Sequence, residues 1–430
     1  MARVAVIGAG WAGLAAAVRA CQAGHAVTLF EASRYAGGRA RTVGVRDADG
    51  GSLALDNGQH ILIGAYTATL SLMEAVGVRP AEVLHAMPLT LRSPDGRGLA
   101  LPAWPAPVDA GWGIATARGW TARDKASLLR AAVRWRMDGF RADAGQTVAH
   151  LCAGLAPRVR QLLIEPLCVS ALNTPMDRAC AQVFLRVLRD SLFGRGWGAW
   201  GASWLLLPRA PLGALFPDAA LRWLSASGAQ LRWGARVQGI DPMPPGWRVD
   251  GEPFDQVLLA CPPAEAARVA AGAGPVAQGW REAARALGHE AIATVYARGG
   301  PRLPLPMLSL PDGPAQFVFD RGQLGGPSGL LAFVVSASTG DRADLEAQVL
   351  AQAGALGWPG LRPLATFVEK RATFACTPGL RRPAASIAPG LRACGDYVEG
   401  PYPATLEGAV RSAAEAVDAI GVSETVRTVR

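Results

Sequence analysis

The chain has 430 residues, of which 50% are hydrophobic and 18% are charged. This composition provides a large core and excludes a disordered or low-complexity protein, and the length suits two or three domains. The formal net charge is +9, but the arginines that produce it are spread along the chain and form no basic tail. Nucleic acid is therefore not an expected partner.

Cysteine and histidine usage gives no sign of a metal site. Neither the seven cysteines nor the five histidines show the spacing of metal ligands, so we expect no metal, and free thiols in a reducing compartment. The chain starts with a strand-like run in place of a secretory signal, and its uncharged stretches are too short or too polar to span a membrane. We expect a cytoplasmic protein.

The beginning of the chain predicts a βαβ unit that binds a dinucleotide. An apolar, β-branched run leads into the glycine fingerprint G-A-G-W-A-G at residues 8–13, and an Ala-rich helical stretch and a second strand follow. In such a unit Gly8 allows the tight turn, Gly10 lets the backbone approach a pyrophosphate, and Gly13 lets the helix pack on the sheet. Glu31 lies 18 residues beyond the last glycine, where it can accept hydrogen bonds from a ribose diol.

A second glycine motif follows directly. The run R-Y-A-G-G-R-A-R-T at residues 34–42 matches R-x-x-G-G-R-x-x-[ST] at every fixed position. It resembles the extended FAD fingerprint of the superfamily of amine oxidases, protoporphyrinogen oxidases and phytoene desaturases. Gly37 and Gly38 remove side chains where a flat ring system must pass close to the backbone, and Arg39 supplies a fixed cation near the pyrophosphate. This motif moves the expected cofactor from NAD to FAD.

The C-terminal part is similar to the flavin segment that closes the chains of this superfamily. It consists of A-C-G-D-Y at 393–397 and Y-P-A-T-L-E-G-A at 402–409. The resemblance implies that the aspartate of the G-D pair meets the ribityl chain of FAD, and that the next helix points its N-terminus at the flavin ring, where it stabilises negative charge. It also implies that the backbone at Val237 lies against the adenine. The cofactor-binding residues predicted from all these motifs are Gly8, Gly10, Trp11, Ala12, Gly13, Glu31, Ala32, Gly37, Gly38, Arg39, Gly58, Gln59, Val237, Gly395, Asp396, Ala404 and Thr405.

A narrower resemblance rests on the segment D-N-G-Q-H at residues 56–60. Together with E-P-L-C at 165–168, L-N-T-P at 172–175 and F-V-F-D-R-G at 317–322, it is similar to the squalene-associated FAD-dependent desaturases, the family of the hydroxysqualene dehydroxylases. The similarity runs from the first strand to the last helix. It implies an FAD-dependent oxidoreductase that removes the hydroxyl group of hydroxysqualene to give squalene, with a hydrophobic isoprenoid substrate and an external electron donor.

The catalytic candidates lie in the same segment. His60 is the first candidate for the proton donor and Asp56 the second, because an imidazolium can supply a proton near neutral pH while an unperturbed carboxyl group cannot. A structural role stays open for both residues. His60 can hydrogen-bond a backbone carbonyl, and Asp56 can accept from the N–H groups of its turn.

Three other functions remain possible on the same motifs. A carotenoid desaturase or isomerase would share the cofactor and an apolar substrate. A flavin amine oxidase would need an active-site lysine, for which Lys370 is available. A non-catalytic scaffold would keep FAD for structure and bind lipid.

The fold class that we expect is α/β, with a Rossmann-like FAD-binding domain interleaved with a mixed α/β substrate domain. Residues 75–209 are expected to be mostly helical, residues 230–240 to form one strand, and a closing helix to start near Thr405. The expected FAD-binding domain is discontinuous and comprises 1–74, 210–275 and 366–430, while the substrate domain comprises 76–209 and 276–365.

Two tryptophan-bearing stretches allow two interpretations each. The stretch 118–140 mixes basic residues with Trp120 and Trp135. This pattern fits either a helix that attaches the protein to the anionic inner face of the cytoplasmic membrane or an ordinary surface helix. The tryptophans of the run 197–204 fit either an apolar pocket or core packing.

Overall fold

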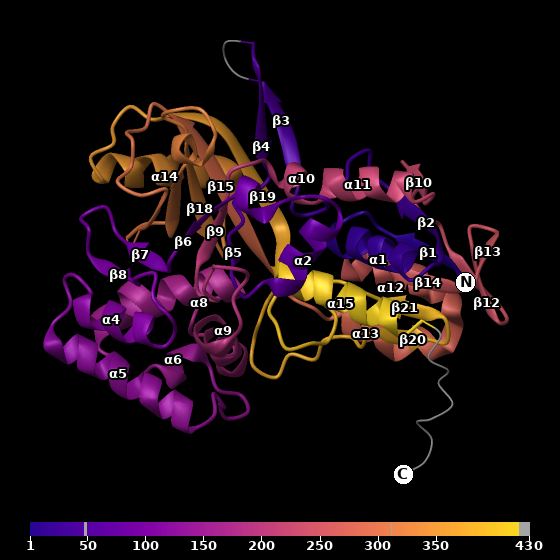
Figure 1. Cartoon of the computed structure of the whole chain (residues 1–430), viewed down its shortest axis with the longest axis horizontal. Coiled ribbons are helices and arrows are strands. Elements are labelled where there is room, and N and C mark those ends of the chain that lie inside the picture. Colours follow the sequence, from indigo (N-terminus) through magenta and orange to yellow (C-terminus); the bar gives the residue numbers. More distant parts are fainter. Residues whose placement is uncertain (47–49, 311, 421–430) are drawn as a thin grey trace.

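The computed structural model describes residues 1–46, 50–310 and 312–420 (Figure 1). The last ten residues of the segment 366–430 therefore lie outside the described residues. Two large sheets dominate the fold, and a lobe of helices lies beside them (Figure 1). Among the described helices, none combines the length and the apolar character needed to cross a bilayer.

The first sheet has six strands in the order β10-β2-β1-β14-β21-β20. The first five run parallel, and β20 pairs antiparallel with β21. All three chain segments expected in the FAD-binding domain supply strands to it. The strands are β1 (Arg3–Ile7), β2 (Ala26–Glu31), β10 (Gln230–Trp233), β14 (Gln256–Leu259), β20 (Ser386–Ala388) and β21 (Leu391–Ala393).

Both faces of this sheet are covered. Val4 and Val6 pack with the helices α1 (Trp11–Gln22), α11 (Pro217–Ala226) and α15 (Leu406–Asp418), while Ala5 and Ile7 face a second core that includes residues of α12 (Pro263–Val269). A strand buried on both faces has no polar alternation, which explains the continuous apolar run at the start of the chain. The doubly wound architecture expected from the glycine fingerprint is confirmed.

The second sheet is antiparallel and has the order β16-β17-β18-β15-β19, with α14 (Arg342–Ala355) packed on it. The expected domain boundary at residue 366 falls inside β19, which pairs with β15 along its whole length and so belongs to this sheet through Phe374. The strands are β15 (His289–Arg298), β16 (Met307–Ser309), β17 (Phe317–Asp320), β18 (Leu331–Ser336) and β19 (Arg362–Phe374).

The helical lobe follows the prediction from residue 108 onwards but not before it. Residues 84–100 form strands in place of helix. β6 pairs with β9, a partner more than a hundred residues away that local propensity cannot reveal, while β7 and β8 pair with each other. The strands of this region are β5 (Leu62–Ile63), β6 (Leu84–Met87), β7 (Thr90–Arg92), β8 (Gly98–Ala100) and β9 (Leu205–Pro208). The helices are α2 (Thr67–Ala75), α3 (Pro80–Val83), α4 (Val108–Thr116), α5 (Ala122–Met137), α6 (Val148–Leu151), α7 (Pro157–Val159), α8 (Glu165–Leu172) and α9 (Ala181–Phe193).

The segment expected as one strand over 230–240 is divided. It breaks at Gly234, whose φ of +63° ends β10, and the chain resumes as a separate three-stranded sheet. The remaining elements are β3 (Thr42–Arg46), β4 (Ser52–Asp56), α10 (Leu212–Leu215), β11 (Ile240–Met243), β12 (Gly246–Val249), β13 (Glu252–Phe254) and α13 (Gln278–Arg285).

A π-helical turn, Arg160–Ile164, joins α7 to α8. Pro166 has no N–H to donate to the carbonyl of Leu162, so the regular α-helical bond is lost there and the helix widens just before the proline. This places Leu163 and Leu167 in the lining of the large cavity described next. The proline of the E-P-L-C motif therefore accounts for the π-helical turn that precedes it.

Candidate active site

One cavity of about 1180 Å³ begins at the carboxyl ends of the parallel strands and extends into the helical lobe. The carboxyl edge of a doubly wound sheet is where this architecture binds its ligands. With two exceptions, Gly13 and Asp56, every cofactor-binding or catalytic residue predicted from the sequence lines this cavity.

Two glycine loops touch each other at the strand ends. Gly10 and Gly37 form an isolated parallel bridge, and the N–H of Gly37 donates to the carbonyl of Ala9 at 2.9 Å. α1 begins at this point with Gly10 as its N-cap, and no side chain caps the helix. The N–H groups of its first turn are left for a ligand anion.

Gly10 and Gly13 differ in what a side chain would meet. A Cβ atom on Gly13 would lie 1.8 Å from the carbonyl oxygen of Gly8, so the packing of the helix on the sheet demands a glycine. A Cβ atom on Gly10 would meet nothing closer than the Cα of Gly38, at 3.9 Å. The protein itself does not require a glycine at position 10, and the space fits the pyrophosphate of a dinucleotide.

Glu31 is held at the end of β2 by two backbone groups. Its carboxylate accepts from the N–H of Ala9 and from the N–H of Ser33, both at 2.7 Å. These bonds fix the side chain at the cavity and still leave each oxygen a lone pair for a ribose hydroxyl. This geometry suits the role predicted for Glu31.

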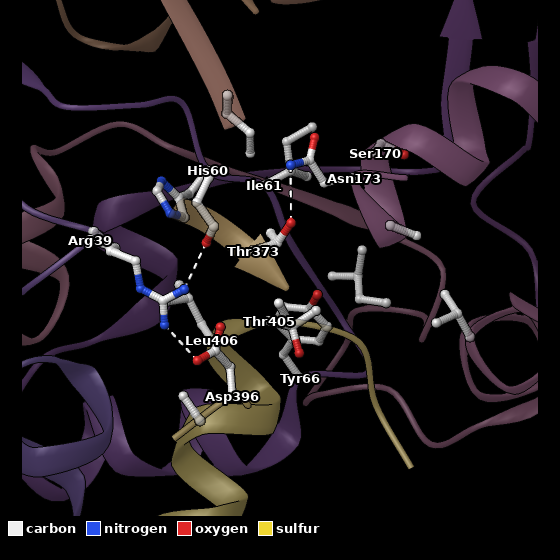
Figure 2. Close-up of a pocket in the computed structure, with 18 of the residues that line it drawn as sticks. Arg39, His60, Ile61, Tyr66, Ser170, Asn173, Thr373, Asp396, Thr405 and Leu406 are labelled. Carbon is white, nitrogen blue, oxygen red and sulfur yellow. Dashed lines mark hydrogen bonds and ion pairs between the residues drawn. The ribbon is translucent and has the colours of Figure 1, made fainter. Parts of the chain in front are cut away.

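Arg39 joins the N-terminal motif to the C-terminal one (Figure 2). Its guanidinium donates to the carboxylate of Asp396 at 2.5 Å and to the carbonyl of Ala372 at 2.7 Å. The sequence motif predicted a fixed cation near the pyrophosphate, and these bonds fix the side chain. In the structure the charge is balanced by Asp396, so Arg39 positions the G-D loop.

Trp11 and Gln59 line the cavity, but their side chains are engaged elsewhere. The indole of Trp11 donates to the carbonyl of Ala40 at 3.0 Å. Gln59 donates to the hydroxyl of Tyr296 at 2.6 Å and accepts from Arg321 at 3.1 Å. Only the backbone of these two residues remains for a cofactor.

His60 lies at the cavity wall between Arg39 and the apolar part (Figure 2). Its Nδ1 is 3.1 Å from the carbonyl oxygen of Gly58. Burial and the nearby Arg39 charge lower the pKa of His60 below its usual 6.5, although the bond to Gly58 opposes this. The lowered pKa reduces the share of imidazolium near neutral pH, and the role of His60 as a proton donor stays a prediction. A neutral ring that donates from Nδ1 leaves Nε2 as an acceptor.

Asp56 does not reach the cavity, so the geometry gives it no catalytic role. Its carboxylate accepts from the N–H of Leu212 at 2.8 Å and from the hydroxyl of Thr42 at 3.4 Å. These bonds fasten β4 to α10. Burial raises the pKa of Asp56 to about 6.

Two polar residues of the cavity wall were missed by the sequence analysis. The hydroxyl of Tyr397 is buried and has no hydrogen-bond partner within the described structure, which marks a place for a ligand atom beside Asp396. Tyr66 lies next to Thr405 (Figure 2), and burial raises the pKa of its phenol, which therefore keeps its proton. Tyr397 follows the G-D pair directly, but nothing in the sequence marks Tyr66.

The L-N-T-P motif ends α8 and ties it to the second sheet. Asn173 adopts a left-handed conformation with φ of +47°. Its side chain donates to the hydroxyl of Thr373 at 3.0 Å and accepts from the N–H of Ala337 at 2.7 Å (Figure 2). The motif thus fixes the wall between the polar and apolar parts of the cavity.

α15 points its N-terminus at the cavity. Thr405 is the N-cap, accepting from the N–H of Gly408 at 3.0 Å, and Ala404 and Leu406 also line the wall. The partial positive charge of this 13-residue helix favours an electron-rich group there. The arrangement fits the flavin ring that the resemblance implies.

The far part of the cavity is apolar. It contains neither of the two lysines: Lys370 is exposed, and Lys125 donates to the carbonyl of Ala115 on the surface. The tryptophans of the run 197–204 lie outside this cavity, so their interpretation as pocket residues is wrong. Two of them pack against the hydrophobic core that contains Val4, Val6 and α1. The lining of the apolar part includes Leu91, Leu99, Leu101, Ile114, Leu128, Phe140, Leu163, Phe184 and Leu188.

Comparison with known proteins agrees with this geometry. The family model for flavin-containing amine oxidoreductases matches residues 11–356. A hydroxysqualene dehydroxylase of Rhodopseudomonas palustris is 28% identical over 97% of this chain and 98% of its own length. A zeta-carotene desaturase of Synechocystis is 40% identical, but over only 18% of this chain and 15% of its own. The crystal structure of an oxidoreductase from Methanosarcina mazei, 18% identical, superposes with a TM-score of 0.73 over 97% of this chain and all of the other.

Gly10→Ala tests the ligand space in the glycine loop. We expect the variant to fold but to bind FAD about 10-fold to 100-fold more weakly, because the added methyl group occupies the cradle. The flavin absorbance of the purified protein measures FAD binding, and thermal unfolding measures whether the variant folds. Gly44→Ala, whose added methyl group would meet nothing within 4 Å and lies outside the cavity, should keep both. Full flavin content in Gly10→Ala would contradict the assignment.

Asp56→Asn tests the structural role of the buried carboxyl group. The folded-state pKa of about 6 lies above the unfolded value near 3.8, so the wild type gains stability as pH falls. We expect its free energy of unfolding to rise by about 1 kcal/mol from pH 7 to pH 5 relative to the variant. Urea unfolding at the two pH values measures this difference, and parallel behaviour of both proteins would rule it out.

Proposed function

Because this chain belongs to the family of flavin-containing amine oxidoreductases, and is an FAD-dependent oxidoreductase, we propose that it removes the hydroxyl group of an isoprenoid alcohol of the hydroxysqualene class. The product is the corresponding hydrocarbon, squalene. The observation that carries this proposal is the cavity itself, in which a polar FAD-binding part continues into a long apolar part. The full-length similarity to a hydroxysqualene dehydroxylase supports the same substrate class.

The two flavin enzymes considered as alternatives are less well supported. An amine oxidase would use a lysine near the flavin, and no lysine lines the cavity. A carotenoid desaturase has a local match only, over 18% of this chain. It would also remove electrons from its substrate, whereas loss of a hydroxyl group requires two electrons and two protons and releases water. We infer that an external donor supplies these electrons. We also infer that the protein works at the cytoplasmic face of a membrane, because an apolar isoprenoid substrate dissolves in the bilayer.

The residues of the cavity divide into three groups by what they do. The glycine loops with Glu31 and the Arg39–Asp396 pair hold and orient FAD, which when bound and reduced supplies the two electrons as a hydride equivalent. The apolar part excludes water, so that a cationic carbon formed when the C–O bond breaks is not captured by it. His60, at the boundary of the two parts, is the group that we propose to exchange a proton with the substrate oxygen.

The lowered pKa of His60 sets the sign of the expected pH dependence. A general acid must carry its proton before the C–O bond breaks, and burial favours the uncharged ring. Turnover should therefore be highest at low pH and fall as pH rises through the lowered pKa. In the alternative, Nε2 only accepts a hydrogen bond from the substrate hydroxyl, and turnover would not follow this titration.

His60→Gln is expected to keep FAD and to lose about 100-fold in turnover, the usual contribution of a general acid. The wild type should show a fall of kcat/KM with a midpoint below pH 6.5, and the variant should lack it. Turnover is measured as squalene formed from hydroxysqualene with a chemical reductant. His150→Gln, on the surface, serves as the control. Wild-type turnover in the variant would return His60 to the structural role.

Lipid analysis tests the reaction itself. In a host that accumulates hydroxysqualene, expression of this chain should convert it to squalene, and Gly10→Ala should reduce that conversion. New double bonds in the lipid would favour the desaturase. Unchanged lipids despite full flavin content would favour the non-catalytic scaffold.

A further inference from the structure

Most of the large apolar side chains that the described residues expose gather on one face of the helical lobe. We name this the entry face. It is formed by α4 and its preceding loop, by α5, and by the end of α9. Its apolar members are Trp104, Trp112, Leu129, Val133, Met137 and Phe193.

The entry face has the pattern of a helix that lies at an interface. Leu129, Val133 and Met137 recur every four residues on α5, so they share one side of it, and Met137 is 81% exposed. Arg130 and Arg134 each follow one residue later and flank the apolar stripe. Long arginine side chains in this position can reach lipid headgroups while the stripe contacts the acyl chains.

The tryptophans of this face are not those expected from the sequence. Trp120 and Trp135 are buried in the core of the lobe. Trp104 and Trp112 are about half exposed instead, and their ring centroids lie 5.3 Å apart. The membrane interpretation of 118–140 is therefore wrong for its two tryptophans, while the arginines of α5 and its apolar residues Leu129, Val133 and Met137 are exposed.

The entry face carries an excess of positive charge, which distinguishes it from an ordinary protein contact surface. α5 carries five basic residues and one acidic residue, Asp124, whose carboxylate is held in the capping box with Thr121. On the edge toward α9, the guanidinium of Arg136 lies 5.0 Å from the ring centre of Phe193. An excess of arginine around exposed apolar groups complements an anionic bilayer.

The cavity reaches the surface through this same face. Leu129, Val133 and Phe193 are exposed, and each also lines the cavity. Gly111 of α4 and Arg136 of α5 line it as well and are exposed too. An apolar path therefore leads from the entry face, between α4, α5 and α9, to the wall that holds His60.

We propose that the entry face rests on an anionic phospholipid bilayer and that the substrate passes from the leaflet directly into the cavity. The lipid contact follows from the surface alone, and the passage of an isoprenoid alcohol rests on the proposed function. A substrate of this class would then never cross water between the membrane and the flavin.

Vesicle sedimentation of the FAD-loaded protein tests the contact. The wild type should bind phosphatidylglycerol-containing vesicles more tightly than phosphatidylcholine vesicles, and salt should weaken this preference. W112Q/M137Q should bind both at least about 10-fold more weakly. R130Q/R134Q should lose roughly 30-fold on the anionic vesicles and little on the neutral ones.

Matched controls remove exposed apolar or basic side chains away from the entry face. W233Q/V276Q removes two exposed apolar groups, one on β10 and one just before α13, and R222Q/R302Q removes two exposed arginines. Both should bind vesicles like the wild type. Equal losses in test and control variants, or wild-type binding by W112Q/M137Q, would overturn the proposal. So would a dimer in vesicle-free solution that W112Q/M137Q abolishes, because the face would then bind a second copy.

Turnover in two substrate forms tests the passage. With hydroxysqualene in vesicles, W112Q/M137Q should be at least about 10-fold slower than the wild type, and with hydroxysqualene in detergent micelles the two should be equal. Equal loss in both forms would overturn direct entry. If the wild type converts neither form, the proposed reaction fails, while the sedimentation result still decides the membrane contact.

Discussion

The ion pair between Arg39 and Asp396 is the contact on which the site depends. It connects two motifs that lie 357 residues apart in the chain, one after β2 and the other after β21, two strands of the same parallel sheet that are separated by β1 and β14. The same guanidinium also binds the carbonyl of Ala372, at the end of the second sheet. One side chain thus joins the dinucleotide loops, the G-D loop and the substrate half of the molecule. Contacts of this kind are needed where two domains are interleaved, because the segments of each half are separated in the sequence and must be held together by side chains.

Most side chains of the D-N-G-Q-H segment are also used to hold the backbone in place. The side chain of Asn57 accepts from the N–H of Arg41 and donates to the carbonyl of Arg39. Gln59 is held by Tyr296 and Arg321, and His60 is left with a free ring nitrogen. The tyrosine hydroxyl in turn donates to the carbonyl of Asp56 at 2.9 Å. These contacts hold the loop from both halves of the protein. Of the polar side chains in this motif that line the cavity, His60 is therefore the one with a ring nitrogen left free, and its neighbours hold the loop in place.

The sequence predicted the parts of the site that short-range backbone geometry decides. The turn at Gly8, the close packing at Gly13 and the N-cap at Thr405 depend on neighbouring residues, and a motif can reveal them. Other features depend on distant partners. The strand at 84–87 pairs with β9, the carboxyl group of Asp56 bonds to α10, and the buried side of α5 is set by its packing on the lobe. The tryptophans were misassigned for this last reason, since composition shows that a helix is amphipathic in a broad sense but not which tryptophan faces the core.

The lining of the cavity changes from polar at the strand ends to apolar in the helical lobe, and this change determines which groups each part can hold. At the strand ends, backbone N–H groups and a balanced ion pair can hold a charged dinucleotide without an unpaired buried charge. Beyond His60 the lining becomes aliphatic and aromatic. A charged group at that boundary is poorly solvated, which lowers the pKa of His60 beside Arg39. The same lack of water would protect a reactive carbon in the apolar part, so the lowered pKa and the exclusion of water have one cause, the change from polar to apolar lining.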